Sequence, residues 1–342
     1  MDWMTMPSES SLDEKCHRIL EEKGGRIADK AKAILLEDVS FEGLEPAFRY
    51  VSQVWRDPLV PALVVLSCEA VGGEPNEDAC QASTAISLLN LSFRLWDDVI
   101  DRSRFMGFVP TVLGKFGDGI SIIMGGVVFA RAFSILSEMD KDREKRKVLN
   151  KLVWNYCRTM GKAETLNLEL RKRKDARPEE KIKVFEMEAM NLETSMKIGS
   201  ILGDGSKNEI EHLGKYGTYL GLILELARDL KASLNLTLEL SQKVNRNALP
   251  YTLLWARDRS KKTGKRLQRL MDECNPTNVR ELVRAVLETG AVENTLSIVN
   301  ELAQKATDEI SSLEDSHSSA QLALLAEAQH EILTESLCHL QS

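Results

Sequence analysis

The sequence predicts an all-α protein. Long stretches carry apolar residues at helical spacing, and almost none show the alternation of a half-buried strand. Leu, Ala, Glu, Lys, Met and Arg, which favour helices, dominate these stretches. The chain has 342 residues, of which 43% are apolar, and can therefore bury one large core or two modest ones. No segment has the composition of an interdomain linker, so we interpret residues 1–342 as a single domain.

Turn-forming segments divide the pattern into helices. A first helix, 11–37, precedes a core that we place at about 47–314. Within the core, breaks fall at 72–75, 105–110, 174–180 and 203–206, which are rich in Gly, Pro, Asp and other turn formers. A last helix, 318–340, follows a polar stretch and forms a C-terminal arm. The expected helices are 11–37, 44–54, 59–72, 77–102, 117–138, 142–173, 180–203, 206–240, 248–259, 263–273, 277–289, 291–314 and 318–340.

Charge and cysteine content exclude several classes of protein. The formal net charge is -7, so nucleic acid is not an expected partner. The six cysteines show no spacing typical of a metal site, and the five histidines form no ligand cluster. We therefore interpret the cysteines as reduced thiols of a cytosolic protein.

Membrane insertion and secretion are not expected either. The first ten residues lack the basic and apolar regions of a secretory signal. The most apolar run, Gly119–Phe133, is shorter than the roughly 18 residues that span a bilayer, so we interpret it as a core helix. We expect a cytoplasmic protein without a transmembrane segment.

Three carboxylates inside the apolar helical run 77–102 are the main functional signal. Asp97 and Asp101 are four residues apart and share one face of a helix, with Asp98 beside them. Carboxylates so close together on an apolar stripe repel one another and lose hydration. A divalent cation and a diphosphate placed over them would compensate for both costs, and Mg²⁺ prefers such oxygen ligands. We therefore take Asp97, Asp98 and Asp101 as candidate catalytic and metal-binding residues.

An ordered series of further landmarks gives the chain a family resemblance from about Ala47 to Leu313. With these landmarks the sequence resembles the trans-polyprenyl diphosphate synthases, which are class I isoprenoid synthases. The landmarks are Val65–Gly73, Trp96–Asp101, Gly107–Gly117, Ala130–Phe133, Ala248–Ala256 and Glu288–Glu293.

The resemblance implies a fold, a cofactor and a substrate. The fold is a bundle of long antiparallel helices around a deep apolar cavity, usually as a dimer. Two aspartate-rich helices hold Mg²⁺ on an allylic prenyl diphosphate, and cations bind the diphosphates. The cavity shields a carbocation and limits the length of the growing chain. At the positions that limit chain length, one to two turns before Asp97, this sequence has Leu89, Ser92 and Phe93.

The second aspartate-rich motif departs from the family pattern. The family has Gln followed by Asp-Asp-x-x-Asp, whereas this chain has Glu225, Arg228, Asp229 and Lys231, followed by Ala232. One aspartate of three remains and another position has become a cation. We take these four charged residues as candidate substrate-binding groups. Arg228 is either an internal counter-ion in the place of a metal or a direct contact of the diphosphate.

The other substrate-binding groups depart as well. The segment that binds isopentenyl diphosphate in the family reads Arg56 to Pro61, with Asp57 and Val60 in place of its lysine and arginine. A family Lys-Thr pair falls on Met187-Glu188. The remaining candidate substrate-binding cations are Arg102, Arg104 and Lys162, with Thr165 and Glu169 at related family positions on the helix of Lys162.

Four functions are compatible with this pattern, and the first is our leading hypothesis. The chain is a divergent subunit that sets chain length in a heteromeric prenyltransferase, paired with a complete paralogue. Alternatively it is a terpene synthase-like enzyme that ionises an allylic diphosphate without isopentenyl diphosphate. It is otherwise a non-catalytic protein that binds prenyl lipids, or a self-sufficient chain-elongating synthase, in which case a homodimer is the expected assembly.

Overall fold

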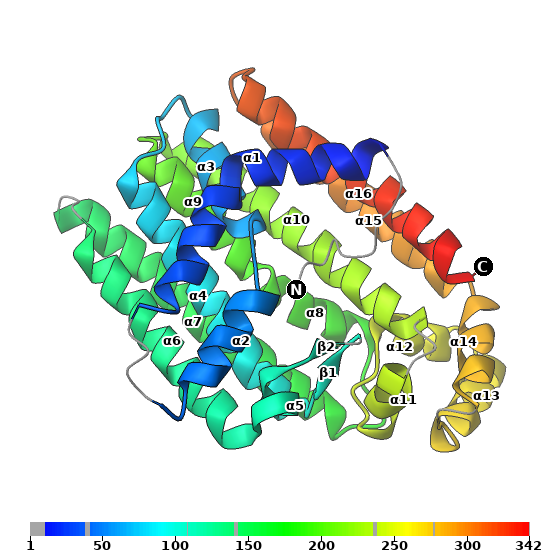
Figure 1. Cartoon of the computed structure of the whole chain (residues 1–342). Coiled ribbons are helices and arrows are strands. Elements are labelled where there is room, and N and C mark those ends of the chain that lie inside the picture. The colour runs from blue at the N-terminus through cyan, green and yellow to red at the C-terminus, as the bar shows by residue number, and fades with distance from the viewer. Residues whose placement is uncertain are drawn as a thin grey trace.

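The structure is a computed structural model that describes residues 11–37, 42–107, 109–139, 143–234, 238–275 and 278–341. Helices account for nearly all of it, which confirms the all-α prediction (Figure 1). The helices are α1 Ser11–Ile34, α2 Glu45–Val54, α3 Leu59–Ala70, α4 Glu77–Ile100, α5 Val112–Phe116, α6 Asp118–Glu138, α7 Arg143–Arg171, α8 Pro178–Glu188, α9 Met190–Leu202, α10 Lys207–Leu234, α11 Leu238–Asn245, α12 Tyr251–Asp258, α13 Lys261–Asp272, α14 Val279–Leu287, α15 Ala291–Ile310 and α16 His317–Gln341.

The long helices α4, α9 and α10 form the middle of the bundle together with α3. α3 is apolar around its whole circumference, and eleven of its twelve residues are buried, as expected for a helix surrounded by others. α4 packs against α6 on one side and against α3 and α9 on another, and α10 packs against α9 and α15. Buried apolar residues form two large clusters, one around α3 and α4 and one around α12 to α15, and α10 contributes to both.

The terminal helices are part of this bundle. α1 and α16 pack against each other and against α3 (Figure 1). Glu69 of α3 accepts hydrogen bonds from Lys23 of α1 at 2.6 Å and from Ser318 of α16 at 2.5 Å. Tyr216 of α10, which is fully buried, donates to the carbonyl oxygen of Leu322 at 2.7 Å. The predicted C-terminal arm therefore docks on the bundle.

Several predicted element boundaries are wrong. The helix expected over 180–203 is divided into α8 and α9 at Ala189, where α10 passes so closely that a Cβ on Gly221 would lie 2.6 Å from the Ala189 side chain. The helix expected over 206–240 ends at Leu234, and residues 235–237 lie outside the described part of the chain. A short antiparallel hairpin lies in the segment 105–110, which was predicted as a break between helices. Its strands, β1 Phe105–Met106 and β2 Val109–Pro110, have two residues each.

α6, Asp118–Glu138, extends beyond the apolar run Gly119–Phe133 that was noted in the sequence. By length and composition alone it is the one helix, among the residues described, that could cross a membrane, although 39% of its most apolar stretch is buried in the protein. Met124, Val128 and Ala132 face the bundle. Four large apolar residues on α6 are at least 38% exposed, namely Ile122, Ile123, Val127 and Phe133.

We predict that Gly199→Ala destabilises the fold. A Cβ at Gly199 of α9 would lie 2.1 Å from the Val64 carbonyl oxygen and 2.0 Å from Ser67 Oγ, so α3 and α9 would have to separate. The free energy of unfolding, measured by urea denaturation, should fall by about 1–3 kcal/mol or more. Gly161→Ala in α7 is the control, because a Cβ there meets nothing within 4 Å. That variant should be neutral, or more stable by up to about 1 kcal/mol. Equal effects of the two substitutions would contradict the close contact.

Candidate functional site: an acidic cluster between α4 and α7

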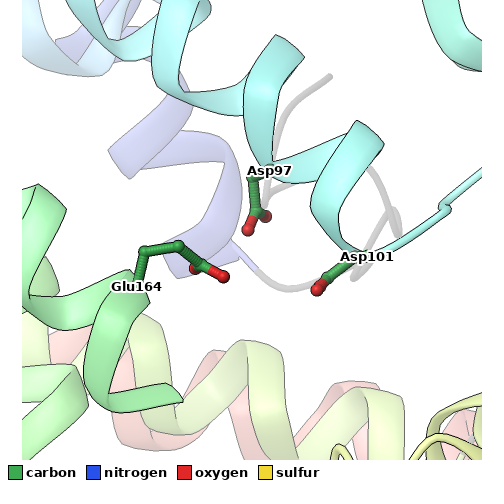
Figure 2. Close-up of side chains that lie close together, drawn as sticks. All are labelled: Asp97, Asp101 and Glu164. Atoms are coloured by element: carbon green, nitrogen blue, oxygen red, sulfur yellow. The ribbon is translucent and has the colours of Figure 1, made fainter. Parts of the chain in front are cut away.

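Three carboxylates meet between the C-terminal end of α4 and the middle of α7. Asp97 and Asp101 come from α4 and Glu164 from α7, and each offers an oxygen within 4.8 Å of the others. Figure 2 shows the three carboxyl groups turned toward the same space. One oxygen of Glu164, Oε1, is buried and has no hydrogen-bond partner. Three hard oxygen donors of this kind fit a divalent cation such as Mg²⁺.

The proton affinities of these groups reflect their crowding. Burial and the neighbouring charges of Asp101 and Glu164 raise the pKa of Asp97 to about 8. Burial, followed by the charge of Asp101, raises the pKa of Glu164. A cation bound between the carboxylates would relieve this repulsion.

Asp98 does not join the three converging carboxylates. Successive helical residues are turned by about 100°, so Asp98 is directed away from the face shared by Asp97 and Asp101. Burial raises the pKa of Asp98 to about 7, and the guanidinium of Arg94, one turn earlier, opposes the shift. Its predicted role in metal binding stays a prediction.

Protein cations already surround the cluster. Arg171, the last residue of α7, forms an ion pair with Oδ1 of Asp101, and Arg246 donates to the main-chain carbonyl of Asp101. Arg171 also lines a small cavity together with Asn167 and Lys181. The site therefore combines carboxylates with guanidinium groups, which suits an anionic ligand bound together with a cation.

Across from α4, the second aspartate-rich position on α10 has a different chemistry. Glu225 is buried and accepts a hydrogen bond from Arg228 Nη2 at 2.8 Å. The charge of Glu225, followed by those of Glu188 and Asp97, raises the pKa of Arg228, which places the guanidinium near both α8 and α4. Glu188 itself has a pKa raised by burial and by Glu225.

Asp229 lies near the start of another helix. The main-chain N–H groups of Tyr251 and Thr252, in the first turn of α12, lower the pKa of its carboxyl, and one carboxylate oxygen, Oδ2, is buried without a hydrogen-bond partner. Burial raises the pKa of Asp229 to about 6, against the opposing charges of Lys181 and Lys243. Lys231 lies away from this group, since the charge it senses is that of Asp13 in α1, and burial lowers its pKa.

Comparison with known proteins agrees with this architecture. The family model described as polyprenyl synthetase matches residues 47–243, more than half of the chain. The chain belongs to the polyprenyl synthetase family. This confirms the resemblance seen in the sequence, and it makes the protein a homologue of the prenyl diphosphate synthases of isoprenoid biosynthesis.

Individual relatives are distant in sequence but close in fold. A short chain isoprenyl diphosphate synthase of Methanothermobacter thermautotrophicus is 25% identical over 89% of this chain and 95% of its own length. A heterodimeric geranylgeranyl pyrophosphate synthase large subunit of Arabidopsis thaliana is 26% identical over 66% of this chain and 62% of its own. The crystal structure of geranylgeranyl pyrophosphate synthetase from Pyrococcus horikoshii superposes with a TM-score of 0.82 at 20% identity. That superposition covers 94% of this chain and 99% of the other.

In this polyprenyl synthetase the segment expected to bind isopentenyl diphosphate is engaged in structural contacts. Arg56 pairs with Glu21 and Asp29 of α1, and its guanidinium lowers the pKa of both carboxyls. Asp57 Oδ1 accepts from the main-chain N–H groups of Leu59 at 3.1 Å and Val60 at 3.5 Å, at the start of α3. The side chain of Val60 is buried.

The other predicted residues are either part of the interior or exposed at the surface. Leu89 and Ser92 are fully buried in α4, and the Phe93 ring lies 5.4 Å from the Tyr156 ring of α7, so these three line the interior. Arg102 and Arg104 are exposed in the segment between α4 and β1, and Arg102 has a positive φ of 50°. Lys162 is exposed, as are Thr165 and Glu169. The structure does not bring Lys162 to the cluster, because Ala163 and Glu164 form the inward face of α7 at that level.

Glu164 and Arg171 were missed by sequence reasoning. They lie on the inward stripe of α7 that begins with Val153 and Tyr156, both buried, and continues at helical spacing. A carboxylate on the apolar face of a long helix is the signal that could have identified Glu164. The family pattern directed attention to Lys162 and Thr165 instead.

We predict that Glu164→Gln weakens binding of Mn²⁺, used as a paramagnetic substitute for Mg²⁺. The affinity, measured by electron paramagnetic resonance, should fall by about tenfold or more, the loss typical of disturbing a metal site. Thermal stability without metal should not fall, because one of three mutually repelling charges is removed. Glu186→Gln, at an exposed position of α8, should change neither quantity. Unchanged Mn²⁺ affinity in Glu164→Gln would exclude Glu164 as a ligand.

Proposed function

We propose that the chain binds an allylic prenyl diphosphate at the cluster of Asp97, Asp101 and Glu164 and acts as a chain-length-setting subunit of a heteromeric prenyl diphosphate synthase. One observation carries the proposal. Three carboxylates converge in the acidic cluster, and the pKa of Asp97 among them is raised, while the segment for the second substrate is engaged in contacts with α1 and α3.

The cluster supports a metal-assisted mode of diphosphate binding. Asp97, Asp101 and Glu164 would hold Mg²⁺, which neutralises charge on a diphosphate as its C–O bond ionises. Asp98 lies on the adjacent face of α4, where Arg94 partly compensates its charge. Arg102 and Arg104 follow α4 directly and are placed to attract the diphosphate to its end. Lys162 on α7 is a more remote cation with the same proposed role.

The interior beside the cluster supports a role in chain length. Leu89, Ser92 and Phe93 lie one to two turns before Asp97 on α4, and the Phe93 ring stacks edge-on with Trp96, Phe129 and Tyr156. Ser92 is small, and its hydroxyl donates to the Leu88 carbonyl at 3.0 Å, so it adds little bulk to this wall. In the proposed role, Phe93 and its neighbouring rings, Ser92 and Leu89 would contact the growing prenyl chain and limit its length.

The missing cations in the segment expected to bind isopentenyl diphosphate support dependence on a partner subunit. Isopentenyl diphosphate is a trianion at neutral pH and requires cations, whereas Asp57 contributes a negative charge at this position. Because Arg56 is paired with two carboxylates of α1, moving it to a ligand would break both contacts. A chain that binds the allylic substrate alone would need another subunit for condensation.

The outer face of α6 supports the existence of that partner. Ile122, Ile123, Val127 and Phe133 are exposed on it, at one end of the bundle (Figure 1). Apolar patches of this kind commonly mark interaction sites. A relative from Arabidopsis is named as the large subunit of a heterodimeric synthase, which is consistent with heteromeric assembly in the family. We place the partner on this face and the complex in the cytoplasm, with the face covered by protein.

Co-expression with a complete prenyl diphosphate synthase from the same organism tests this assembly. The two chains should co-purify, and the product length of the partner should change. Val127→Asp places a charge on the outer face of α6 and should abolish co-purification. Leu168→Asp, at an exposed apolar position of α7, is the matched control and should leave the complex intact. The proposal fails if the chains never associate and the products of the partner stay the same.

The purified chain alone should not bind isopentenyl diphosphate. By calorimetry, we expect no measurable affinity for it up to about 1 mM, a range in which binding is weaker than about 4 kcal/mol. Farnesyl diphosphate with Mg²⁺ should bind at least about tenfold more tightly. Elongation by the chain alone would identify a self-sufficient synthase. Release of a hydrocarbon without isopentenyl diphosphate would identify a terpene synthase-like enzyme.

A further inference from the structure

Arg228 is placed at the acidic site as an accessible cation. Its side chain is 65% exposed, although Glu225, its hydrogen-bond partner, is buried. The contact at 2.8 Å joins only Nη2 to Glu225 Oε1, on the turn before Arg228. Glu225 therefore engages one terminal nitrogen of the guanidinium group, which has five N–H donors, and the exposed side chain leaves the other donors for a ligand.

Around Arg228, α10 carries one aspartate, Asp229, which lies near the first turn of α12. The positive charges of Lys181 and Lys243 lower the pKa of Asp229 and so partly compensate its charge. In the parts of the chain that the structure describes, the group of carboxylates close enough to hold an ion comes from α4 and α7, without a member from α10.

The two halves of the site also differ in formal charge. On α8 to α11, three carboxylates, Glu188, Glu225 and Asp229, are balanced by three cations, Lys181, Arg228 and Lys243. On the other half, four carboxylates face three guanidinium groups, those of Arg94, Arg171 and Arg246. The α4–α7 half therefore carries the more negative formal charge, and it is also where three carboxylates converge.

We propose that Arg228 contacts the diphosphate of the ligand directly and takes the place of a metal on α10, so that metal binds only between α4 and α7. The inference rests on the proposed function, because it assigns a second contact for the same diphosphate. A planar guanidinium matches two phosphoryl oxygens with two parallel hydrogen bonds. The diphosphate would then lie between the metal held by the carboxylates of α4 and α7 on one side and the guanidinium of Arg228 on the other.

Binding of farnesyl S-thiolodiphosphate, which cannot ionise readily, tests the inference together with a count of bound Mn²⁺. At saturating Mn²⁺, Arg228→Ala should weaken binding of the analogue by about tenfold or more, as expected for a lost charge-assisted contact. Inorganic pyrophosphate should lose a similar factor, because the contact is to the headgroup. The number of Mn²⁺ ions per chain, counted by electron paramagnetic resonance, should stay the same.

Three further variants keep the result interpretable. Arg228→Ala leaves Glu225 buried without its partner, so the double variant E225Q/R228A is measured beside it and should show the same loss of affinity. Arg228→Lys should recover part of the affinity, since it keeps the charge without the paired hydrogen bonds. Lys183→Ala, at an exposed position of α8, should bind as the unmodified chain does.

The outcomes separate this inference from the function on which it rests. Unchanged or tighter binding in Arg228→Ala, or fewer bound Mn²⁺ ions, would overturn the role of Arg228 while leaving the proposed function in place. Absence of any binding of the analogue by the unmodified chain would overturn both.

Discussion

Repulsion among carboxylates enclosed by apolar helices is the constraint on which the site depends. Oxygens of Asp97, Asp101 and Glu164 lie within 4.8 Å of one another beside the largely apolar interior of the bundle. Such an arrangement opposes folding unless it is compensated, and here Arg171 forms an ion pair with Asp101 and lowers the pKa of Glu164. A cation bound between the three carboxylates would remove this repulsion. The packing of α7 against α4 brings Glu164 close to Asp97 and Asp101, and so it determines where the cation would bind.

Charged residues elsewhere in the bundle have structural roles. Asp57 caps the start of α3, a contact typically worth about 1 kcal/mol. Arg56 joins α1 to the segment before α3. The resemblance in sequence places these positions where diphosphates or metals bind in the family, and in this chain their side chains contact neighbouring helices instead.

Sequence reasoning found two of the three carboxylates of the acidic cluster and could not find the third. Asp97 and Asp101 are four residues apart, so a single helix is enough to bring them together. Glu164 is 63 residues further along the chain than Asp101, and no local rule links α7 to α4. Asp98 looked equivalent to its neighbours in the sequence, yet the turn of the helix directs it toward Arg94. Lys162 and Glu164 are two residues apart and therefore face different directions, which a motif count cannot detect.

By itself, the sequence determined the helical class, the family and the acidic motif, because helical periodicity, turn composition and residue order are local properties of a chain. It also showed that charges were inverted at Asp57 and Arg228. Only the tertiary structure decided what surrounds these positions, since Arg56 beside Asp57 pairs with Glu21 and Asp29 of α1, and the charges of Glu188 and Asp97, on other helices, act on Arg228. Electrostatic interactions depend on distance in space, and packing of the bundle sets that distance.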